Sequence, residues 1–290
     1  MPTLSFALVD VFAAAPLSGN PLAVIPDADP IPEAVMPRIA QEFNQSETTF
    51  VLSSTEPRAT WRLRSFTARG DEVTGAGHNA LGAWWWLAQS GRVATGDFTQ
   101  ELGGGLGDLT IRRNADNTLQ VAMHQGPGSI AGEVASSALA APLGLAPGQL
   151  TAEPARVVST GAAHLLVAAR ERAAVQAARP EPSLLLDVLR NASAQGCYLY
   201  ATGPGNTAHA RFFNPTVGLW EDAATGSAAG PLSWLLCGGR SGRLTVEQGD
   251  AIGRPSRIEL RVDDGQVTLL GSAALFAEGH IHIPKQGDAR

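Results

Sequence analysis

Cysteine is nearly absent from this chain, which has only Cys197 and Cys237 among its 290 residues. The two lie far apart, and neither belongs to a CxxC motif or a Cys/His cluster. A disulfide framework and a zinc site are therefore not expected, and no metal is assigned. Two buried thiols without a chemical role are the simplest interpretation.

Long apolar runs are missing as well. The stretch from Ala80 to Ala88 is far shorter than the ~20 residues that a membrane span requires. The first residues, Met1-Pro-Thr-Leu-Ser-Phe, show no basic segment followed by an apolar run and a small-residue cleavage site, so secretion is not indicated. We therefore expect a cytoplasmic protein without membrane association.

Clustered positive charge is the third absence. The net charge is -6, and the Lys and Arg residues are scattered, which gives no electrostatic footprint for nucleic acid. A phosphate-binding glycine loop between a strand and a helix is also lacking, because Gly103-Gly-Gly-Leu-Gly and Gly203-Pro-Gly are better explained as turns. We expect a small-molecule substrate and no nucleotide cofactor.

The residues that are present predict two domains with many strands. Apolar residues make up 44% of the chain, enough to bury a sizeable core. A helix is expected over 33–43, and 131–153, rich in Ala, Gly and Pro, suggests an inter-domain passage with one short helix. Strands are expected at 4–12, 22–25, 48–52, 60–66, 109–111, 119–123, 156–159, 164–168, 196–200, 208–214, 244–248, 258–262, 267–271 and 273–278.

Two helices are predicted to be apolar on nearly every face. One begins at His78 and stops at Ser90-Gly91, and the other begins at Gly226 and stops at Gly238-Gly239. Pro231 limits where regular hydrogen bonding begins in the second. A helix of this kind must be surrounded by protein, so the two halves of the chain resemble each other.

Glu47 is the first candidate for chemistry. It lies between small polar residues and the apolar run Phe50-Val51-Leu52, so it enters a strand from a polar edge. A partly desolvated carboxyl there can take and return a proton near neutral pH. A surface glutamate at a strand start is the alternative interpretation.

The starts of the two apolar helices are the other candidates. Gly75 and Gly77 precede His78 and let a ligand approach the backbone, and the free N–H groups of a helix start suit a substrate carboxylate. Asp222 precedes Thr225-Gly226-Ser227 in the same arrangement. A histidine that only caps or fills the core, and a Thr225 or Ser227 that only caps the second helix, are the alternatives.

Four blocks, in this order, resemble the PhzF (phenazine-biosynthesis-like) family. They are Val9-Asp-Val-Phe with Gly19-Asn-Pro-Leu-Ala-Val24; Ala40-Gln-Glu-Phe-Asn-Gln-Ser-Glu47-Thr-Thr-Phe-Val; Arg64-Ser-Phe-Thr with Glu72 and Gly77-His78; and Arg211-Phe-Phe-Asn-Pro with Glu221-Asp222-Ala-Ala-Thr-Gly-Ser-Ala. They span most of the chain.

The resemblance implies an α+β, diaminopimelate-epimerase-like fold of two similar domains. Each would be a mostly antiparallel sheet wrapped around a central helix, with the active site in the cleft between them. The domains would cover 1–125, completed by a C-terminal strand near 275–290, and 126–274. A homodimer without a cofactor, acting on a small carboxylated substrate, is also implied.

The resemblance further implies roles for individual residues. Glu47 would be the general acid/base of an isomerase, and His78 and Asp222 would position and protonate the substrate. Polar and backbone contacts to the substrate would come from Ser46, Gly77, Gly226 and Ser227.

Two other functions stay open at this point. Epimerases and racemases of this fold generally use two cysteines on opposite faces of the substrate carbon, and here neither thiol adjoins the candidate turns. One carboxylate favours proton relocation within a molecule. An epimerase, racemase or lyase acting on an amino-acid-like substrate, with Asp222 or His78 as the opposite base, and a non-catalytic dimeric small-acid binding protein are the alternatives.

The chain departs from the family pattern next to the first helix. Thr67-Ala68 replaces the usual Thr-Pro, and the segment that follows is longer by one residue. Thr74-Gly75 replaces a bulkier pair, and Asn79 follows His78 where a small residue is common. These changes predict an altered pocket, so the substrate can differ from the dihydro-hydroxyanthranilate of the founding members.

Overall fold

The computed structural model describes residues 3–217 and 219–283. It divides into two compact units, one comprising Met1–Met123 with Gly271–Arg290 and the other His124–Leu270. The boundaries expected from the sequence were at 125 and 274. Residues 284–290 of the expected C-terminal strand lie outside the described part.

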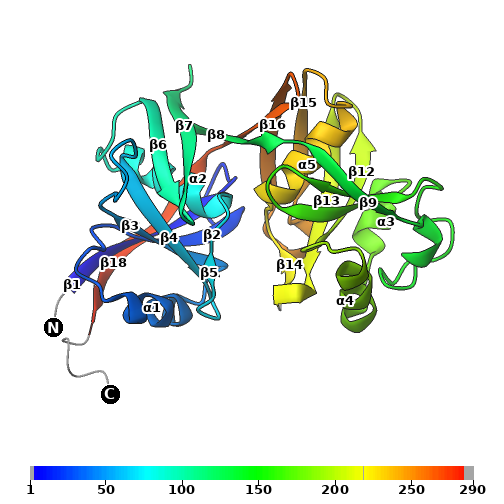
Figure 1. The fold of residues 1–290 in the computed structure, drawn as a ribbon, viewed down its shortest axis with the longest axis horizontal. Coiled ribbons are helices and arrows are strands. Elements are labelled where there is room, and N and C mark those ends of the chain that lie inside the picture. Colours follow the sequence, from blue (N-terminus) through cyan, green and yellow to red (C-terminus); the bar gives the residue numbers. More distant parts are fainter. Residues whose placement is uncertain (1–2, 218, 284–290) are drawn as a thin grey trace. The chain divides into compact units, whose positions relative to one another are not determined.

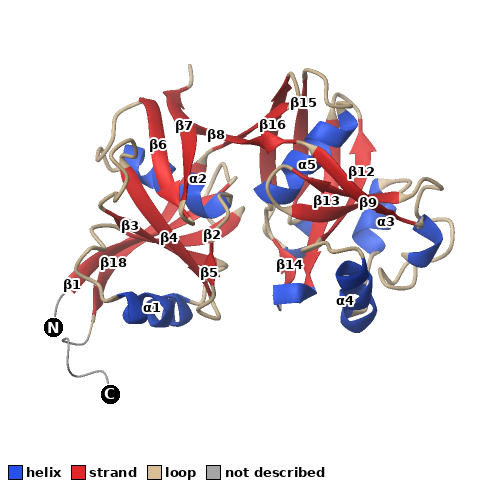
Figure 2. Ribbon diagram, viewed as in Figure 1, coloured by secondary structure: helices blue, strands red, loops and turns tan. Residues whose placement is uncertain are grey.

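The first unit is a mostly antiparallel sheet with few helices (Figures 1 and 2). Its strands are β1 (Thr3–Val11), β2 (Asn20–Ile25), β3 (Glu47–Leu52), β4 (Trp61–Thr67), β5 (Glu72–Val73), β6 (Gly96–Leu102), β7 (Gly105–Arg113), β8 (Leu119–Pro127) and β18 (Ala273–His282). Its helices are η1 (Glu33–Val35), α1 (Met36–Phe43) and α2 (His78–Gln89). The predicted helices at 33–43 and from His78 are confirmed.

Helix α2 is buried from His78 to Ala88 and contacts β1, β2, β3, β7 and β18. Gly82 allows the strands to approach closely, because a Cβ there would lie 2.5 Å from Val11 and 2.7 Å from Leu22. The indole of Trp84 donates to Gln100 Oε1 at 2.7 Å, which satisfies its buried N–H. The apolar helix is therefore enclosed by its own sheet, as its composition requires.

The second unit is also a mostly antiparallel sheet, and its helices are short (Figures 1 and 2). Its strands are β9 (Ser129–Val134), β10 (Ala155–Ser159), β11 (Ala163–Ala168), β12 (Cys197–Gly203), β13 (Thr207–Asn214), β14 (Leu219–Asp222), β15 (Gly242–Gln248), β16 (Ser256–Asp263) and β17 (Gln266–Gly271). Its helices are η2 (Ser136–Ala138), α3 (Arg172–Ala177), α4 (Pro182–Asn191), η3 (Pro215–Val217), α5 (Gly226–Leu236) and η4 (Asp250–Ile252).

One expectation for the second unit was wrong, and two helices were missed. Residues 131–153 are not a passage with a helix, because β9 pairs with β10 through its backbone and only the single 3-10 turn η2 follows. No helix was predicted from the sequence at 172–191, where α3 and α4 lie. Both are short, and α4 is held by its packing, with Leu185 and Leu189 buried.

The pairing scheme of the first unit recurs in the second. In the first, β18, β1 and β2 are antiparallel neighbours, β2 runs parallel to β3, and β4 pairs with β3, β5 and β6. In the second, β9, β10 and β11 are antiparallel neighbours, β11 runs parallel to β12, and β13 pairs with β12, β14 and β15. Helix α5 begins just after the short strand β14, as α2 begins just after the corresponding short strand β5. The chain therefore contains a structural repeat.

The helices of the described part are all too short or too polar to cross a membrane.

Candidate functional site

Glu47 is the first residue of β3, where it pairs with Leu22 of β2 and Thr67 of β4. Its side chain is 17% exposed. The chain reaches β3 through a turn containing Ser46, after Asn44 ends α1 in the left-handed conformation with φ 49°. The carboxylate therefore stands at the polar end of a buried strand, as the sequence predicted.

His78 is the first residue of α2, and its imidazole lies beside Glu47. Nε2 of His78 is 3.8 Å from Oε2 of Glu47, which is too long for a hydrogen bond. Burial lowers the pKa of His78 from 6.5 to about 4, so the ring is neutral at neutral pH. The structure thus brings together two of the three predicted catalytic residues. We call Ser46, Glu47, Gly77 and His78 the Glu47 site.

The loop before α2 is tied down by Asn79. Its Oδ1 accepts a hydrogen bond from the Gly77 N–H at 2.7 Å, and its Nδ2 donates to the Gly75 carbonyl at 3.0 Å. Asn79 is 1% exposed, and Thr49 Oγ1 donates to its carbonyl at 3.4 Å. Asn79, a departure from the family pattern, thus fixes the loop that leads to His78.

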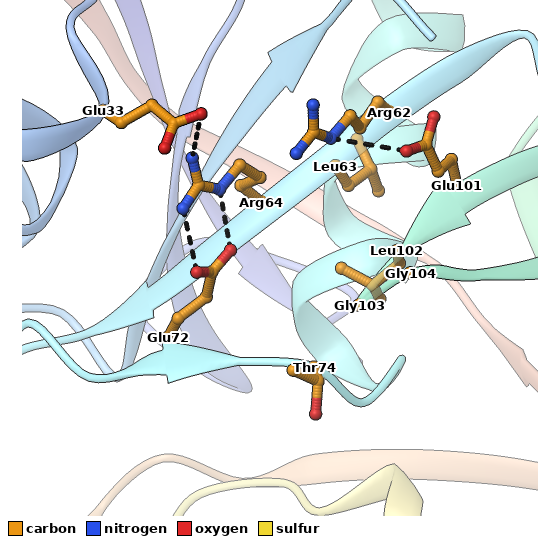
Figure 3. Close-up of a pocket in the computed structure, with 10 residues that line it drawn as sticks. All are labelled: Glu33, Arg62, Leu63, Arg64, Glu72, Thr74, Glu101, Leu102, Gly103 and Gly104. Carbon is orange, nitrogen blue, oxygen red and sulfur yellow. Dashed lines mark hydrogen bonds and ion pairs between the residues drawn. The ribbon is translucent and has the colours of Figure 1, made fainter. Parts of the chain in front are cut away.

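The charged residues of the third sequence block are paired with one another (Figure 3). Arg64 of β4 donates to Glu72 of β5 through Nε at 2.7 Å and Nη2 at 2.9 Å, and its Nη1 lies 3.3 Å from Glu33. Arg62 lies 3.5 Å from Glu101. These residues line a pocket of about 270 Å³ to which neither Glu47 nor His78 contributes. Its cations already have carboxylate partners, so it does not resemble an anion site.

Asp222 is the last residue of β14 and belongs to a buried hydrogen-bonded turn. Thr225 Oγ1 donates to Asp222 Oδ2 at 2.6 Å. Gln248, which is fully buried, donates to Thr225 Oγ1 at 3.0 Å and to the Asp222 carbonyl at 2.8 Å. Its Oε1 accepts from Tyr198 at 2.8 Å. The Asp222 carboxylate is therefore held in one orientation.

Thr225 and Ser227 do not cap α5, which excludes the alternative interpretation that they serve only as caps. Thr225 occupies the N-cap position, but α5 has no side-chain cap hydrogen bond. The Thr225 hydroxyl is instead used by Asp222, and its N–H donates to Gln248 at 3.2 Å. By helix geometry the N–H groups of Gly226 and Ser227 have no partner within the helix. We call Asp222, Thr225, Gly226 and Ser227 the Asp222 site.

Ser227 has a neighbour that the sequence did not indicate. Its Oγ lies 3.3 Å from Nε2 of His164, at the start of β11. His164 is 3% exposed, and burial lowers its pKa from 6.5 to about 4. Its only sequence signal was a histidine opening an apolar strand, which does not distinguish a functional residue from a core residue. Gln248 had no signal at all.

Arg211 and Glu221, from the fourth block, form a buried ion pair in the second unit. Arg211 donates to Glu221 through Nε at 2.9 Å and Nη2 at 2.7 Å. Its Nη1 donates to the carbonyls of Val175 and Ala178 at the end of α3. The two side chains are 6% and 4% exposed. This pair holds β13, β14 and α3 together, so its role is structural.

The two thiols lie outside both sites. Cys197 is buried in β12, where burial raises its pKa from 9.0 to about 12. Cys237, at the end of α5, is only partly buried, so the expectation of two buried thiols was wrong for it; its partial burial also raises its pKa. Both therefore stay protonated and unreactive at neutral pH. Within 3–217 and 219–283, no three His, Cys, Asp or Glu residues are grouped as metal ligands.

The two buried histidines predict acid sensitivity. Because the pKa of His78 and of His164 falls from 6.5 to about 4 on folding, the unfolded chain binds protons between these pH values that the folded chain does not. Stability is therefore lost as the pH falls from 6.5 to 4, by about 3 kcal/mol for each histidine. Urea unfolding measured across this range should show this loss.

Matched variants separate this effect from general acid denaturation. His164→Gln should remove its share of the loss, and His280→Gln, at an exposed position, should not. An unchanged pH slope in His164→Gln would contradict the prediction.

Comparison with known proteins gives consistent matches over nearly the whole chain. The family model described as phenazine biosynthesis-like protein matches residues 9–279. A trans-2,3-dihydro-3-hydroxyanthranilate isomerase from Pseudomonas aeruginosa is 32% identical over 287 residues, which cover 96% of this chain and 99% of the relative.

Comparison with solved structures gives matches to the same family and to related folds. A phenazine biosynthesis protein of the PhzF family from Bacillus anthracis has a TM-score of 0.89 and 27% identity, covering 98% of this chain and all of that one (100%). A hydroxyproline epimerase from Agrobacterium vitis has a TM-score of 0.65 at 11% identity, covering 96% and 92% of the two chains. The second likeness concerns the fold alone.

Proposed function

The chain belongs to the phenazine biosynthesis-like protein family and is an isomerase, and from this premise we propose the reaction that it catalyses. It relocates a proton, and with it a double bond, within a small carboxylated substrate. Glu47 takes the proton from one atom, the carboxyl group exchanges it with water, and Glu47 delivers a proton to another atom. The reaction needs no metal, nucleotide or other cofactor.

The observation that carries this proposal is the arrangement of Glu47 and His78. Glu47 is a mostly buried carboxylate whose neighbour, at 3.8 Å, is an imidazole kept neutral by burial. A charged His78 would hold the carboxylate in an ion pair. A neutral ring does not, and it has one N–H to donate and one lone pair to accept. The Glu47 site can therefore exchange a proton with a substrate.

Each of the two helix starts offers groups that can bind a carboxylate. The first N–H groups of α2 and of α5 have no partner within their helices, and each helix start carries positive partial charge. Gly77 leaves room for a ligand, because a Cβ there would meet only Asn79 Oδ1, at 3.7 Å. By family resemblance, Asp222 orients a substrate through the carboxylate that Thr225 holds.

Proton relocation is favoured over stereoinversion because the second unit of the structural repeat has no acidic residue at the position equivalent to Glu47. When the two units are aligned on Arg64 and Arg211, the position of Glu47 corresponds to Gly196. A Cβ at Gly196 would lie 2.4 Å from the Phe212 ring. Epimerases of this fold generally use a pair of cysteine thiols as bases. In this chain the pKa values of both thiols, Cys197 and Cys237, are raised. Glu47 is therefore the single proton carrier in the proposed reaction.

The test is isomerisation in deuterated water. The probes are trans-2,3-dihydro-3-hydroxyanthranilate, taken from the relative's activity, and a panel of small unsaturated carboxylates. We expect a double-bond isomer that carries deuterium at the carbon gaining the proton, with unchanged configuration at other stereocentres. Dialysis against a chelator should leave the rate unchanged.

Other products would point to the alternatives. An inverted stereocentre would indicate an epimerase, and a product that has lost a fragment would indicate a lyase. Saturable binding of the panel without deuterium exchange would indicate a binding protein. The homodimer implied by the resemblance is part of the proposal, and sedimentation velocity tests it.

A further inference from the structure

The pair formed by His164 and Ser227 is not used by the proposed proton transfer. His164 extends from β11 in the core of the second unit, and its Nε2 lies 3.3 Å from Ser227 Oγ on the first turn of α5. The ring also packs edge-on against Phe212, with centroids 5.1 Å apart. A polar ring at this depth has a cost in free energy unless it is hydrogen-bonded, so its single partner is informative.

The structural repeat shows that a histidine is not required at this position by the fold. Gly77-His78 follows Glu72 at the same spacing as Gly226-Ser227 follows Glu221, so His78 corresponds to Ser227. In the same alignment, His164 corresponds to Leu22, which is fully buried against α2. The first unit fills this place with an apolar side chain, and the second places an imidazole beside the helix start.

The other ring nitrogen of His164 indicates the tautomer. Nδ1 is buried and has no hydrogen-bond partner among the residues that the structure describes. A neutral imidazole has one N–H and one lone pair. An unpaired buried N–H is rarer in proteins than an unpaired acceptor. The proton is therefore expected on Nε2, from which it is donated to Ser227 Oγ.

We propose that His164 is a positioning residue, which donates from Nε2 to Ser227 Oγ and so directs the Ser227 hydroxyl proton toward a carboxylate ligand at the start of α5. The hydroxyl then acts with the N–H groups of Gly226 and Ser227 on one anionic oxygen. This inference rests on the proposed function in one respect, that the ligand is the carboxylate of its substrate.

The burial pattern at the helix start supports this direction. Gly226 and Ala228 are buried, whereas Ser227 between them is partly exposed, so a ligand can reach its hydroxyl. Because the oxygen accepts from His164, its own proton points elsewhere. The Gly226 carbonyl is occupied by Gln125, which donates to it at 3.1 Å, and Gly226 is thereby fixed. The start of α5 is thus organised before a ligand binds.

The first test needs no substrate. Nitrogen-15 NMR of the histidine rings in the full chain, with His164 assigned through the His164→Gln variant, reports which nitrogen carries the proton at pH 7. We expect the neutral ring with its proton on Nε2. A proton on Nδ1, or a charged ring, would overturn the proposal whether or not the protein is an isomerase.

The second test measures the affinity for 2-aminobenzoate, used as a stable carboxylate probe. His164→Phe and Ser227→Ala should each weaken binding about tenfold or more. The serine variant loses the hydrogen bond to the charged carboxylate, and the histidine variant loses the group that orients the Ser227 hydroxyl. The double variant should bind the probe as tightly as whichever single variant has the lower affinity, because the two residues act as one unit. His164→Gln, whose amide can donate to Ser227, should bind within about threefold of the wild type.

Several results would refute the role of His164. These are unchanged affinity in His164→Phe with its thermal unfolding intact, additive losses in the double variant, or no saturable binding of the probe to the wild type. The proposed reaction is tested separately by deuterium exchange. If exchange fails while the NMR and binding results hold, the isomerase reaction is wrong and the carboxylate site remains.

Discussion

Replacing Glu47 with Gln is expected to lower kcat for isomerisation by about 10²- to 10⁴-fold, the usual contribution of a general acid/base. The amide has nearly the shape of the carboxylate but cannot accept and return a proton. Substrate binding should change much less, because the helix-start N–H groups remain. Steady-state kinetics and deuterium incorporation, measured on the first substrate that the exchange screen identifies, check this prediction.

A matched control is available on α1. Glu42 is exposed near the end of that helix, so Glu42→Gln makes the same chemical change away from the site. It should leave kcat unchanged, and both variants should unfold at nearly the wild-type temperature. Undiminished turnover by the Glu47→Gln variant would remove Glu47 from the role of proton carrier.

The largest stability effect is expected for Arg211→Leu. This change leaves the carboxylate of Glu221 buried without its partner, and it removes the donor to the carbonyls of Val175 and Ala178. Breaking a buried ion pair in this way costs about 3–5 kcal/mol. Urea unfolding of the two proteins, monitored by tryptophan fluorescence, measures the loss.

An exposed pair provides the comparison. Arg156 and Glu133 lie 3.1 Å apart with side chains 43% and 52% exposed, so Arg156→Leu should cost at most about 1 kcal/mol. Adding Glu221→Leu to the Arg211 variant should restore part of the loss, because it removes the stranded charge. Equal effects of the Arg211 and Arg156 substitutions would show that the buried pair is not structural in the way described.

The local elements were largely predictable because each depends on its own residues. The apolar stretch after His78 indicated a helix enclosed by protein, and α2 is buried along almost its whole length. Gly103-Gly-Gly-Leu-Gly and Gly203-Pro-Gly were expected as turns. Residues 103–104 and the segment from Gly203 do connect β6 to β7 and β12 to β13, but residues 105–107 belong to β7. The helices at 172–191 were missed because their stability comes from packing rather than from a strong local signal.

The candidate site was only partly predictable. The sequence by itself, through its helix starts and its resemblance to one family, determined that Glu47, His78 and Asp222 are the residues to consider. It did not determine the 3.8 Å contact of Glu47 with His78, the burial that keeps His78 neutral, or the use of the Thr225 hydroxyl by Asp222. Nor did it indicate that His164 and Gln248 lie beside the start of α5.

Those features depend on contacts between residues far apart in the chain. A hydroxyl can cap a helix or bind a carboxylate, and an imidazole can be charged or neutral. Which occurs is set by the partners that strand register brings within hydrogen-bond distance and by how completely they exclude water. The sequence therefore determined which chemical groups this protein has, and the tertiary structure decided their partners and their protonation.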